Sequence, residues 1–280
     1  MRRLQSLLNF VKIEHTLFSL PLIYSGVFLA ALEPPGLSLI ILIFFASVGA
    51  RTVALSLNRL IDLEIDKRNP RTTGRELPSG RLTVREAAAI LGISLILYFV
   101  SAGLISKFCL YLSPIPLVIF TFYPYMKRFT ALAHIGVGLG LSMAPLGGWF
   151  AVAQSFQNIL PGALLSLFTL LWVSGFDIIY STLDELFDRQ ENLHSFSSKY
   201  GKQKALKISG YFHVAAFLAL GLLFVVYIKA VAALPFLFVS GYLLYLEHKQ
   251  ADDVEFAFFK VNAALGFVVL GMVVAGVYFP

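Results

Sequence analysis

The feature that most constrains the fold is a series of nine apolar stretches, each of roughly 16 to 23 residues, against the ~20 that one bilayer-spanning helix needs. Short polar connections separate them. The pattern therefore predicts about nine transmembrane helices, which take up roughly two-thirds of the chain. The predicted segments are Thr16 to Leu32, Leu37 to Leu57, Ala87 to Ile105, Leu110 to Tyr125, Ala131 to Ala153, Ile159 to Tyr180, Ser209 to Ile228, Val231 to Leu246 and Val261 to Phe279.

The composition agrees with a membrane protein. Of the 280 residues, 58% are hydrophobic and 14% are charged, whereas a soluble domain is about 25% charged. We expect an all-α, polytopic membrane protein that forms one domain over residues 1–280. The single cysteine, Cys109, allows neither an internal disulfide nor a thiolate metal site.

The basic residues flank the apolar stretches, so the net charge of +6 indicates topology and no nucleic-acid partner is expected. If the N-terminus is cytoplasmic, Lys107 and Lys229 are the only basic residues on the opposite side. This asymmetry places two long connections, Asn58 to Glu86 and Ser181 to Lys207, on the cytoplasmic face of an inner or cytoplasmic membrane. The first stretch lacks a cleavage pattern and is expected to be retained, and Arg3 to Glu14 has the pattern of an interfacial helix.

Two acidic clusters lie where apolar helices run into the long connections. In NRLIDLEID, three oxygen-bearing side chains lie four residues apart, and in DIIYSTLDELFD four such side chains follow at intervals of three, four and four. On a continuing helix each set lies along one face. The first set is Asn58, Asp62 and Asp66, and the second is Asp177, Tyr180, Asp184 and Asp188.

Like charges at this spacing repel one another, so a cation is the natural compensation. Carboxylate and amide oxygens without nearby cysteine or convergent histidine suit Mg²⁺, which is usually shared with substrate phosphates. The alternative is that these acids solvate loop surfaces and pair with neighbouring Lys and Arg. Asp177 follows an apolar run directly, and an ionisable residue at membrane depth is typical of a functional site, although snorkelling to the interface is its alternative role.

Basic residues accompany both clusters, as phosphate binding requires. Arg51 interrupts the second apolar stretch on the same face as Asn58, so we expect it to meet an anion in a polar cavity. Tyr123 and Lys127 share a face if the helix continues through Pro124, and the run NPRTTGRELPSG predicts a loop that closes over a substrate. The loop arginines alternatively set only topology. The five histidines show no metal-ligand spacing and are assigned no chemistry.

These motifs resemble the UbiA-type intramembrane aromatic prenyltransferases over essentially the whole chain. The resemblance rests on Asn58, Asp62 and Asp66 in NRLIDLEIDKRNPRTTGRELPSG, on Asp177, Tyr180, Asp184 and Asp188 in the second cluster, and on Tyr123 and Lys127 between them. It implies a helical bundle around a central cavity that opens sideways to lipid. Asp-rich cytoplasmic segments at 58–86 and 177–207 are expected to cap this cavity.

The resemblance also implies the reaction, transfer of a polyprenyl group from its diphosphate to an aromatic ring. Mg²⁺ held by the acidic clusters would make the diphosphate a leaving group. The expected metal ligands are Asp62, Asp66, Asp184 and Asp188, assisted by Asn58; the residues expected to stabilise the leaving group are Arg51, Lys127 and Lys12; and the other substrate contacts are Arg71, Tyr123 and Tyr180. Asp62 or Asp177 is a candidate acceptor for the proton of the acceptor's hydroxyl. For Lys12, interfacial anchoring is an equal alternative.

The stretches KIEHTLFSLP, NPRTTGRELPSG and FDIIYSTLDELFDR look most like the quinone-pathway enzymes of ubiquinone or menaquinone biosynthesis, which prenylate 4-hydroxybenzoate or a hydroxylated naphthoate. Haem, chlorophyllide and glycerol-phosphate acceptors occur in relatives with less similar signatures. A cation-coupled transporter is the alternative of another class, but it expects ionisable residues near the bilayer midplane. The Asp-Gly-containing signature of CDP-alcohol phosphotransferases is not found, and the intact aspartates disfavour a noncatalytic scaffold.

Overall fold

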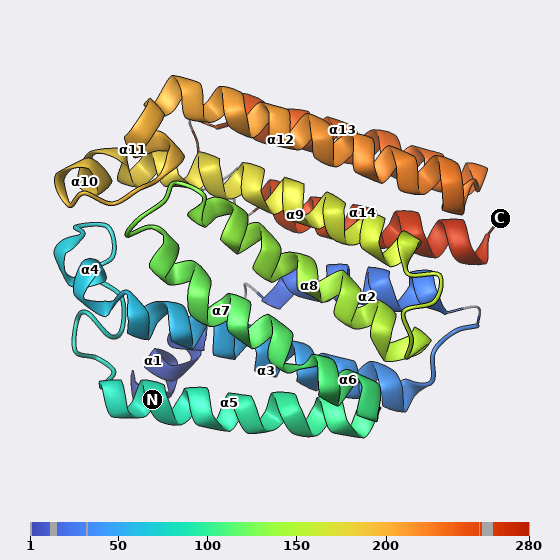
Figure 1. Cartoon of the computed structure of the whole chain (residues 1–280), viewed down its shortest axis with the longest axis horizontal. Coiled ribbons are helices and arrows are strands. Elements are labelled where there is room, and N and C mark those ends of the chain that lie inside the picture. Colours follow the sequence, from blue (N-terminus) through green and yellow to red (C-terminus); the bar gives the residue numbers. More distant parts are fainter. Residues whose placement is uncertain (1, 12–15, 32, 252, 254–259, 280) are drawn as a thin grey trace.

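The computed structural model describes residues 2–11, 16–31, 33–251, 253 and 260–279, and the regular structure of these residues is entirely helical. The predicted all-α fold is confirmed. The long helices run side by side along the longest axis of the molecule (Figure 1). In chain order the helices are α1 (Arg2–Val11), α2 (Thr16–Ala30), α3 (Leu37–Ile61), α4 (Leu63–Arg68), α5 (Val84–Ile105), α6 (Lys107–Leu112), α7 (Pro114–Met126), α8 (Ala133–Ala153), α9 (Leu160–Ser181), η2 (Thr182–Asp184), α10 (Glu185–Gln190), α11 (Phe196–Tyr200), α12 (Lys202–Leu223), η3 (Phe224–Ile228), η4 (Val231–Ala233), α13 (Leu234–Lys249) and α14 (Asn262–Tyr278).

Seven helical segments within the described residues are long and apolar enough to cross a membrane. Two further predicted segments correspond to shorter apolar helices, Ser19–Ala30 and Asn262–Tyr278. The predicted count of nine spans therefore remains a prediction, whereas the polytopic helical architecture stands. One predicted stretch, Leu110 to Tyr125, is divided between α6 and α7, because Pro114 begins a new helix after Ser113.

Helix α9 is the centre of the bundle. Its apolar window is 72% buried, against 17 to 44% for the other long helices. Leu165, Phe168 and Trp172 have almost no exposed surface and pack against α12 and α14 residues. This burial fixes the direction of α9, and hence the position of the polar residues near its C-terminal end.

The short polar helices gather at one end of the bundle. In Figure 1, α4, α10 and α11 all lie at the left end, beside the last turns of α3 and α9. The expected interfacial helix at the N-terminus also packs against protein here, because Phe10 is fully buried among Leu77, Leu82 and Ala87. The Arg59 guanidinium lies 5.2 Å from the centre of the Phe10 ring.

Helices α2 and α8 approach so closely that only glycine fits at their contact. A methyl group on Gly148 would lie 1.9 Å from the carbonyl oxygen of Ile23, and one on Gly26 would lie 2.0 Å from that of Pro145. Small residues at such contacts let helix backbones approach in membranes, where packing replaces the hydrophobic effect as the driving force for association. Backbone atoms cannot move aside as a flexible side chain can.

We therefore expect Gly148→Ala to lower the free energy of unfolding by about 1–3 kcal/mol, through overpacking between α2 and α8. The control is Gly147→Ala on the same helix, where an added methyl meets no atom within 4 Å. It should leave stability unchanged or raise it by up to ~1 kcal/mol, since alanine favours a helix over glycine. Thermal unfolding in detergent measures both, and equal midpoints for the two variants would contradict the close contact.

Candidate active site

A polar cavity of about 200 Å³ lies at the end of the bundle that carries the short helices. It brings together most of the site residues that the sequence predicts. Those that line it are Asn58, Asp62, Asp66, Arg71, Tyr123, Lys127, Asp177, Tyr180, Asp184 and Asp188. The predicted residue Lys12 lies outside the described residues.

The first acidic cluster keeps the predicted alignment although α3 formally ends at Ile61. The Asp62 amide donates to the Asn58 carbonyl at 2.9 Å, and the Asp66 amide donates to the Asp62 carbonyl at 2.8 Å, so helical hydrogen bonding continues into α4. Asp62 is nearly buried and faces Lys127 Nζ at 2.7 Å and an Arg128 Nη at 3.3 Å. Burial raises the pKa of the Asp62 carboxyl above its ordinary value, although Lys127 and Arg128 oppose this shift.

The second acidic cluster departs from the predicted continuous helix. Helix α9 ends at Ser181, the single 3-10 turn η2 follows, and Asp188 lies on the separate helix α10. The three aspartates therefore do not lie along one face of a single helix. Asp177, Asp184 and Asp188 nevertheless all line the polar cavity.

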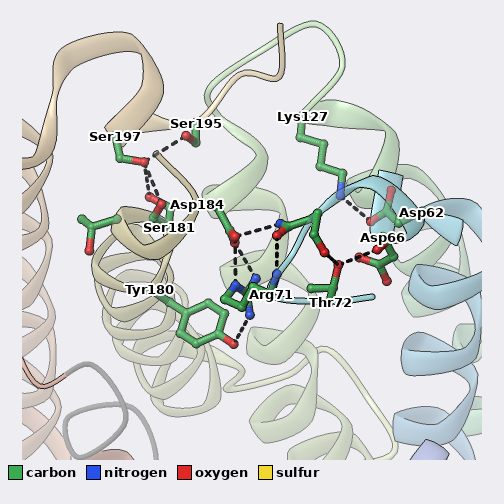
Figure 2. Close-up of polar contacts among 12 residues, drawn as sticks. Asp62, Asp66, Arg71, Thr72, Lys127, Tyr180, Ser181, Asp184, Ser195 and Ser197 are labelled. Atoms are coloured by element: carbon green, nitrogen blue, oxygen red, sulfur yellow. Dashed lines mark hydrogen bonds and ion pairs between the residues drawn. The ribbon is translucent and has the colours of Figure 1, made fainter. Parts of the chain in front are cut away.

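Arg71, in the loop after α4, links the two acidic clusters. Its guanidinium is hydrogen-bonded through Nε to Asp184 at 2.9 Å, pairs with the same carboxylate through Nη2, and donates from Nη1 to the Tyr180 hydroxyl at 2.7 Å (Figure 2). Burial lowers the pKa of Arg71, but the hydrogen bond with Asp184 outweighs it and the pKa lies above its ordinary value. The loop therefore crosses from one acidic cluster to the other.

Three contacts in this loop were not predicted as site features. Asn69 donates to Asp184 at 2.8 Å, an Arg75 Nη donates to both oxygens of Asp66 at 3.1 and 2.8 Å, and the Thr72 hydroxyl donates to the Asp66 carbonyl at 3.0 Å. The sequence places Arg75 in the loop NPRTTGRELPSG but gives it no carboxylate partner. The pairing of Asn69 with Asp184 carries no local sequence signal, because the two residues are 115 positions apart.

A histidine also belongs to the polar cavity. His134 on α8 lies with Nδ1 2.7 Å from Oδ2 of Asp177, and its Nε2 accepts from the backbone amide of Phe196 at 3.4 Å. Spacing could not identify it, because it lies 43 residues from Asp177. His194 also lines the polar cavity, but it too lies far from His134 in the sequence. The histidine spacing in the sequence predicted no chemistry for His134.

An apolar cavity of about 440 Å³ lies next to the polar one along the same helices. On α3, α7 and α8 the residue pairs that line the apolar and the polar cavity are three or four positions apart, or about 5 Å of helix. These pairs are Ala54 and Asn58, Phe120 and Tyr123, and Gly140 and Val137. Arg51 lines the apolar cavity two turns from Asn58 and is the charged residue of that wall.

The donor set suits a metal that is shared with a ligand. No three His, Cys, Asp or Glu side chains among the described residues are grouped closely enough to hold a metal ion by themselves. The carboxylates are instead compensated by Lys127, Arg71 and Arg75. Mg²⁺ usually takes one or two protein carboxylates together with substrate phosphates and water. Carboxylates and basic side chains on one cavity thus fit Mg²⁺ bound to a phosphorylated molecule.

Fold and site together define a class of integral membrane enzyme in which a charged cavity lies beside an apolar one. Residues 19–262 match the UbiA prenyltransferase family, and the chain belongs to this family of enzymes that transfer prenyl groups. The predicted resemblance is confirmed.

Similar proteins agree with this assignment. The 4-hydroxybenzoate octaprenyltransferase of Francisella tularensis subsp. novicida is 26% identical over 251 residues, covering 86% of this chain and 85% of that protein. The apo structure of a UbiA homolog from Aeropyrum pernix K1 has a TM-score of 0.86 and 34% identity, covering 92% of this chain and 96% of that one. A UbiA homolog from Archaeoglobus fulgidus, solved bound to GPP and Mg²⁺, shares the fold with a TM-score of 0.69 at 17% identity, covering 95% and 99% of the two chains.

A buried ion pair anchors the loop that carries Arg71. Arg59 on α3 pairs with Glu76 at 2.7 Å, and their side chains are 3% and 9% exposed. Burial would raise the pKa of Glu76, but a backbone hydrogen bond and Arg59 outweigh it and hold the pKa below its ordinary value. The stability contributed by this pair is therefore present at neutral pH and is lost as the pH falls below 4.5, through the lowered pKa of the folded state.

Replacing Glu76 by Gln should lower the free energy of unfolding by about 3–5 kcal/mol, because the Arg59 charge stays buried without its partner. Hydrogen–deuterium exchange of residues 70–82 should rise as well. The matched control is Glu64→Gln, which removes a surface pair with Lys67 whose side chains are 46% and 74% exposed and should change stability by less than ~1 kcal/mol. Equal effects of the two substitutions would show that the loop is not anchored through Glu76.

Proposed function

We propose that this protein transfers a polyprenyl group from a polyprenyl diphosphate to a ring carbon of an aromatic acid, in a Mg²⁺-dependent reaction. The observation that carries the proposal is the charged cavity stacked on the apolar one along α3, α7 and α8. A polyprenyl diphosphate has the same division into an anionic head and an apolar tail. Each part of the donor thus finds a matching environment.

The metal would be held at the polar cavity by carboxylates of both acidic clusters. The proposed ligands are Asp62, Asp66, Asp184 and Asp188, with Asn58 assisting. When bound, Mg²⁺ neutralises the diphosphate and makes it a better leaving group. The Archaeoglobus homolog supports this choice, because a protein of the same fold was solved with GPP and Mg²⁺.

Basic and hydroxyl side chains of the cavity would bind the diphosphate directly. Arg71 and Lys127 now compensate Asp184 and Asp62, and they are placed to turn to phosphate oxygens when a metal neutralises those carboxylates. Tyr123 and Tyr180 add hydroxyl donors on the same wall. Arg51 would stabilise the negative charge that develops on the leaving diphosphate, and Lys12 remains a proposed further contact.

The apolar cavity would protect the reacting carbon. Cleavage of the allylic C–O bond leaves a carbocation, which the surrounding apolar side chains shield from water until the electron-rich ring attacks. Loss of a proton restores the aromatic ring. Asp62 or Asp177 is the candidate acceptor of the proton from the acceptor's hydroxyl.

The proposed class of acceptor rests on similarity to a relative. The choice of a transferase over a transporter rests on where the charged residues lie. The Francisella relative is named for 4-hydroxybenzoate, and its identity of 26% leaves a hydroxynaphthoate as an equal candidate. Either acceptor would place the protein in ubiquinone or menaquinone biosynthesis. The charged residues that line the polar cavity come from segments at one end of the bundle, which favours a transferase over a transporter. We propose that this end, with the N-terminus, faces the cytoplasm of an inner membrane and that residues 1–280 act as one domain.

The purified protein in detergent, supplied with Mg²⁺ and geranylgeranyl diphosphate, should prenylate 4-hydroxybenzoate or 1,4-dihydroxynaphthoate-type acids when each is offered separately. Mass spectrometry identifies the product. EDTA should abolish the reaction and added Mg²⁺ should restore it, because the diphosphate leaves only when its charge is neutralised. Activity that is indifferent to EDTA would refute the metal requirement, and Mg²⁺-dependent diphosphate binding without any prenylated acid would refute the acceptor class.

Replacing Asp66 or Asp184 by Ala should reduce kcat by about 100-fold or more, because each carboxylate is proposed to hold the metal that stabilises the leaving group. The fold should persist, since both side chains lie at the polar end of the bundle and outside the apolar core clusters. Steady-state rates are compared with those of Glu64→Ala, a change at a neighbouring exposed acid. Wild-type rates in either aspartate variant would remove that residue from the metal site.

A further inference from the structure

We propose that His134 is a positioning residue that fixes the Asp177 carboxylate, so that Oδ1 of Asp177 accepts the hydroxyl proton of the aromatic acceptor. This inference rests on the proposed function and deepens it, because it selects one base from the two candidates and names the residue that orients it.

The hydrogen bonds of His134 define its role. A neutral imidazole has one N–H donor and one nitrogen acceptor. Nε2 accepts from the Phe196 amide, so the proton lies on Nδ1, which donates to Oδ2 of Asp177 at 2.7 Å. Both ring nitrogens are then engaged, and His134 cannot itself take a proton from a substrate. It can only orient its partner.

Burial keeps this arrangement in place. The side chain of His134 is 8% exposed and that of Asp177 is 21% exposed. The imidazole also packs against the Phe196 ring at a centroid distance of 5.7 Å. The hydrogen bond uses one carboxylate oxygen of Asp177 and leaves Oδ1 available to a molecule in the polar cavity that Asp177 lines.

The other candidate base is less suited to accept a proton. The Asp62 carboxylate is 3% exposed and faces Lys127 at 2.7 Å, Arg128 at 3.3 Å and the Asn58 amide at 3.1 Å. Both of its oxygens already face other side chains, Oδ2 facing Lys127 and Asn58 and Oδ1 facing Arg128, so neither is open to the hydroxyl of an acceptor. Asp62 therefore serves metal and phosphate binding better than proton transfer.

Asp177 lies deeper in the bundle than the proposed metal ligand Asp184. Asp177 lies seven residues before Asp184, which corresponds to about 10 Å along a helix toward the centre of the bundle. On α8, His134 is one turn from Val137, and Val137 is one turn from Gly140 in the wall of the apolar cavity. The pair thus lies between the metal-binding acids and the space proposed for the prenyl tail.

The proton transfer balances with the rest of the reaction. The C–O bond to diphosphate breaks first, with its electron pair on the diphosphate. Asp177 then takes the hydroxyl proton as the ring carbon bonds to the first carbon of the donor. The dienone formed then loses the hydrogen of the substituted ring carbon as a proton to the departing diphosphate. The proton on Asp177 returns to the oxygen, which restores the hydroxyl and the carboxylate.

Two substitutions separate positioning from packing. In His134→Asn, the side-chain amide can take the place of Nδ1–H and donate to Asp177. In His134→Gln, the side chain can instead reach the Phe196 amide and lose the contact with Asp177. We expect His134→Ala and His134→Gln to lower kcat by about 10–100-fold with little change in the KM for the donor, and His134→Asn to recover most of the rate.

A double substitution tests whether His134 acts through Asp177. Asp177→Asn should lower kcat at least as far as His134→Ala, and the His134→Ala/Asp177→Asn variant should be no slower than Asp177→Asn alone. The proposal would be overturned if His134→Gln recovered kcat and His134→Asn did not, or if the losses of kcat in the double variant were additive. His134 would then be a structural contact of the Phe196 segment.

A measurement without turnover keeps this inference separate from the proposed function. If the wild-type protein prenylates neither acid, the proposed acceptor class fails, and ¹⁵N NMR of histidine-labelled protein decides the hydrogen bond by itself. The His134 signal is assigned by its absence from His134→Asn. We expect a neutral ring protonated on Nδ1 that changes in Asp177→Ala, and a ring protonated on Nε2 would overturn the assignment.

Discussion

The structure depends on placing several carboxylates at the end of an apolar helical bundle. Uncompensated charges in such a place are costly, because removing an ion from water has a large desolvation penalty. The protein meets this constraint with basic side chains from other segments, as in the pairs of Asp62 with Lys127 and Asp66 with Arg75. The same pairs prepare the site for its ligand. When a metal binds the carboxylates and an anionic phosphate binds the basic side chains, every charge still has a partner of opposite sign.

The helices that carry the charges also form the wall of the apolar space. Helices α3, α7 and α8 pass from the polar cavity to the apolar one within a single turn. The close contact of α2 and α8 at Gly26 and Gly148 fixes one side of this wall, and the buried helix α9 fixes the other. Rigid packing of apolar segments therefore sets the distance between the place that binds an anionic head and the place that accepts an apolar tail.

Much of the candidate site could be predicted because its members lie at helical spacing. Asn58, Asp62 and Asp66 needed only the continuation of a helix to reach one cavity. Contacts between distant segments could not be predicted in this way. The pairs of His134 with Asp177 and of Asn69 with Asp184 join residues 43 and 115 positions apart, and no periodicity links them.

The sequence by itself determined that the chain is a bundle of membrane helices with two acidic clusters, because segment length, hydropathy and helical periodicity are local properties. Only the tertiary structure decided how the clusters face each other, where the helix after Ser181 changes type, and which cation compensates which carboxylate. The crossing of Arg71 from one cluster to Asp184 in the other is the clearest case. Pairing of this kind follows from how α3 and α9 pack in space, and packing depends on side-chain shape across the whole bundle.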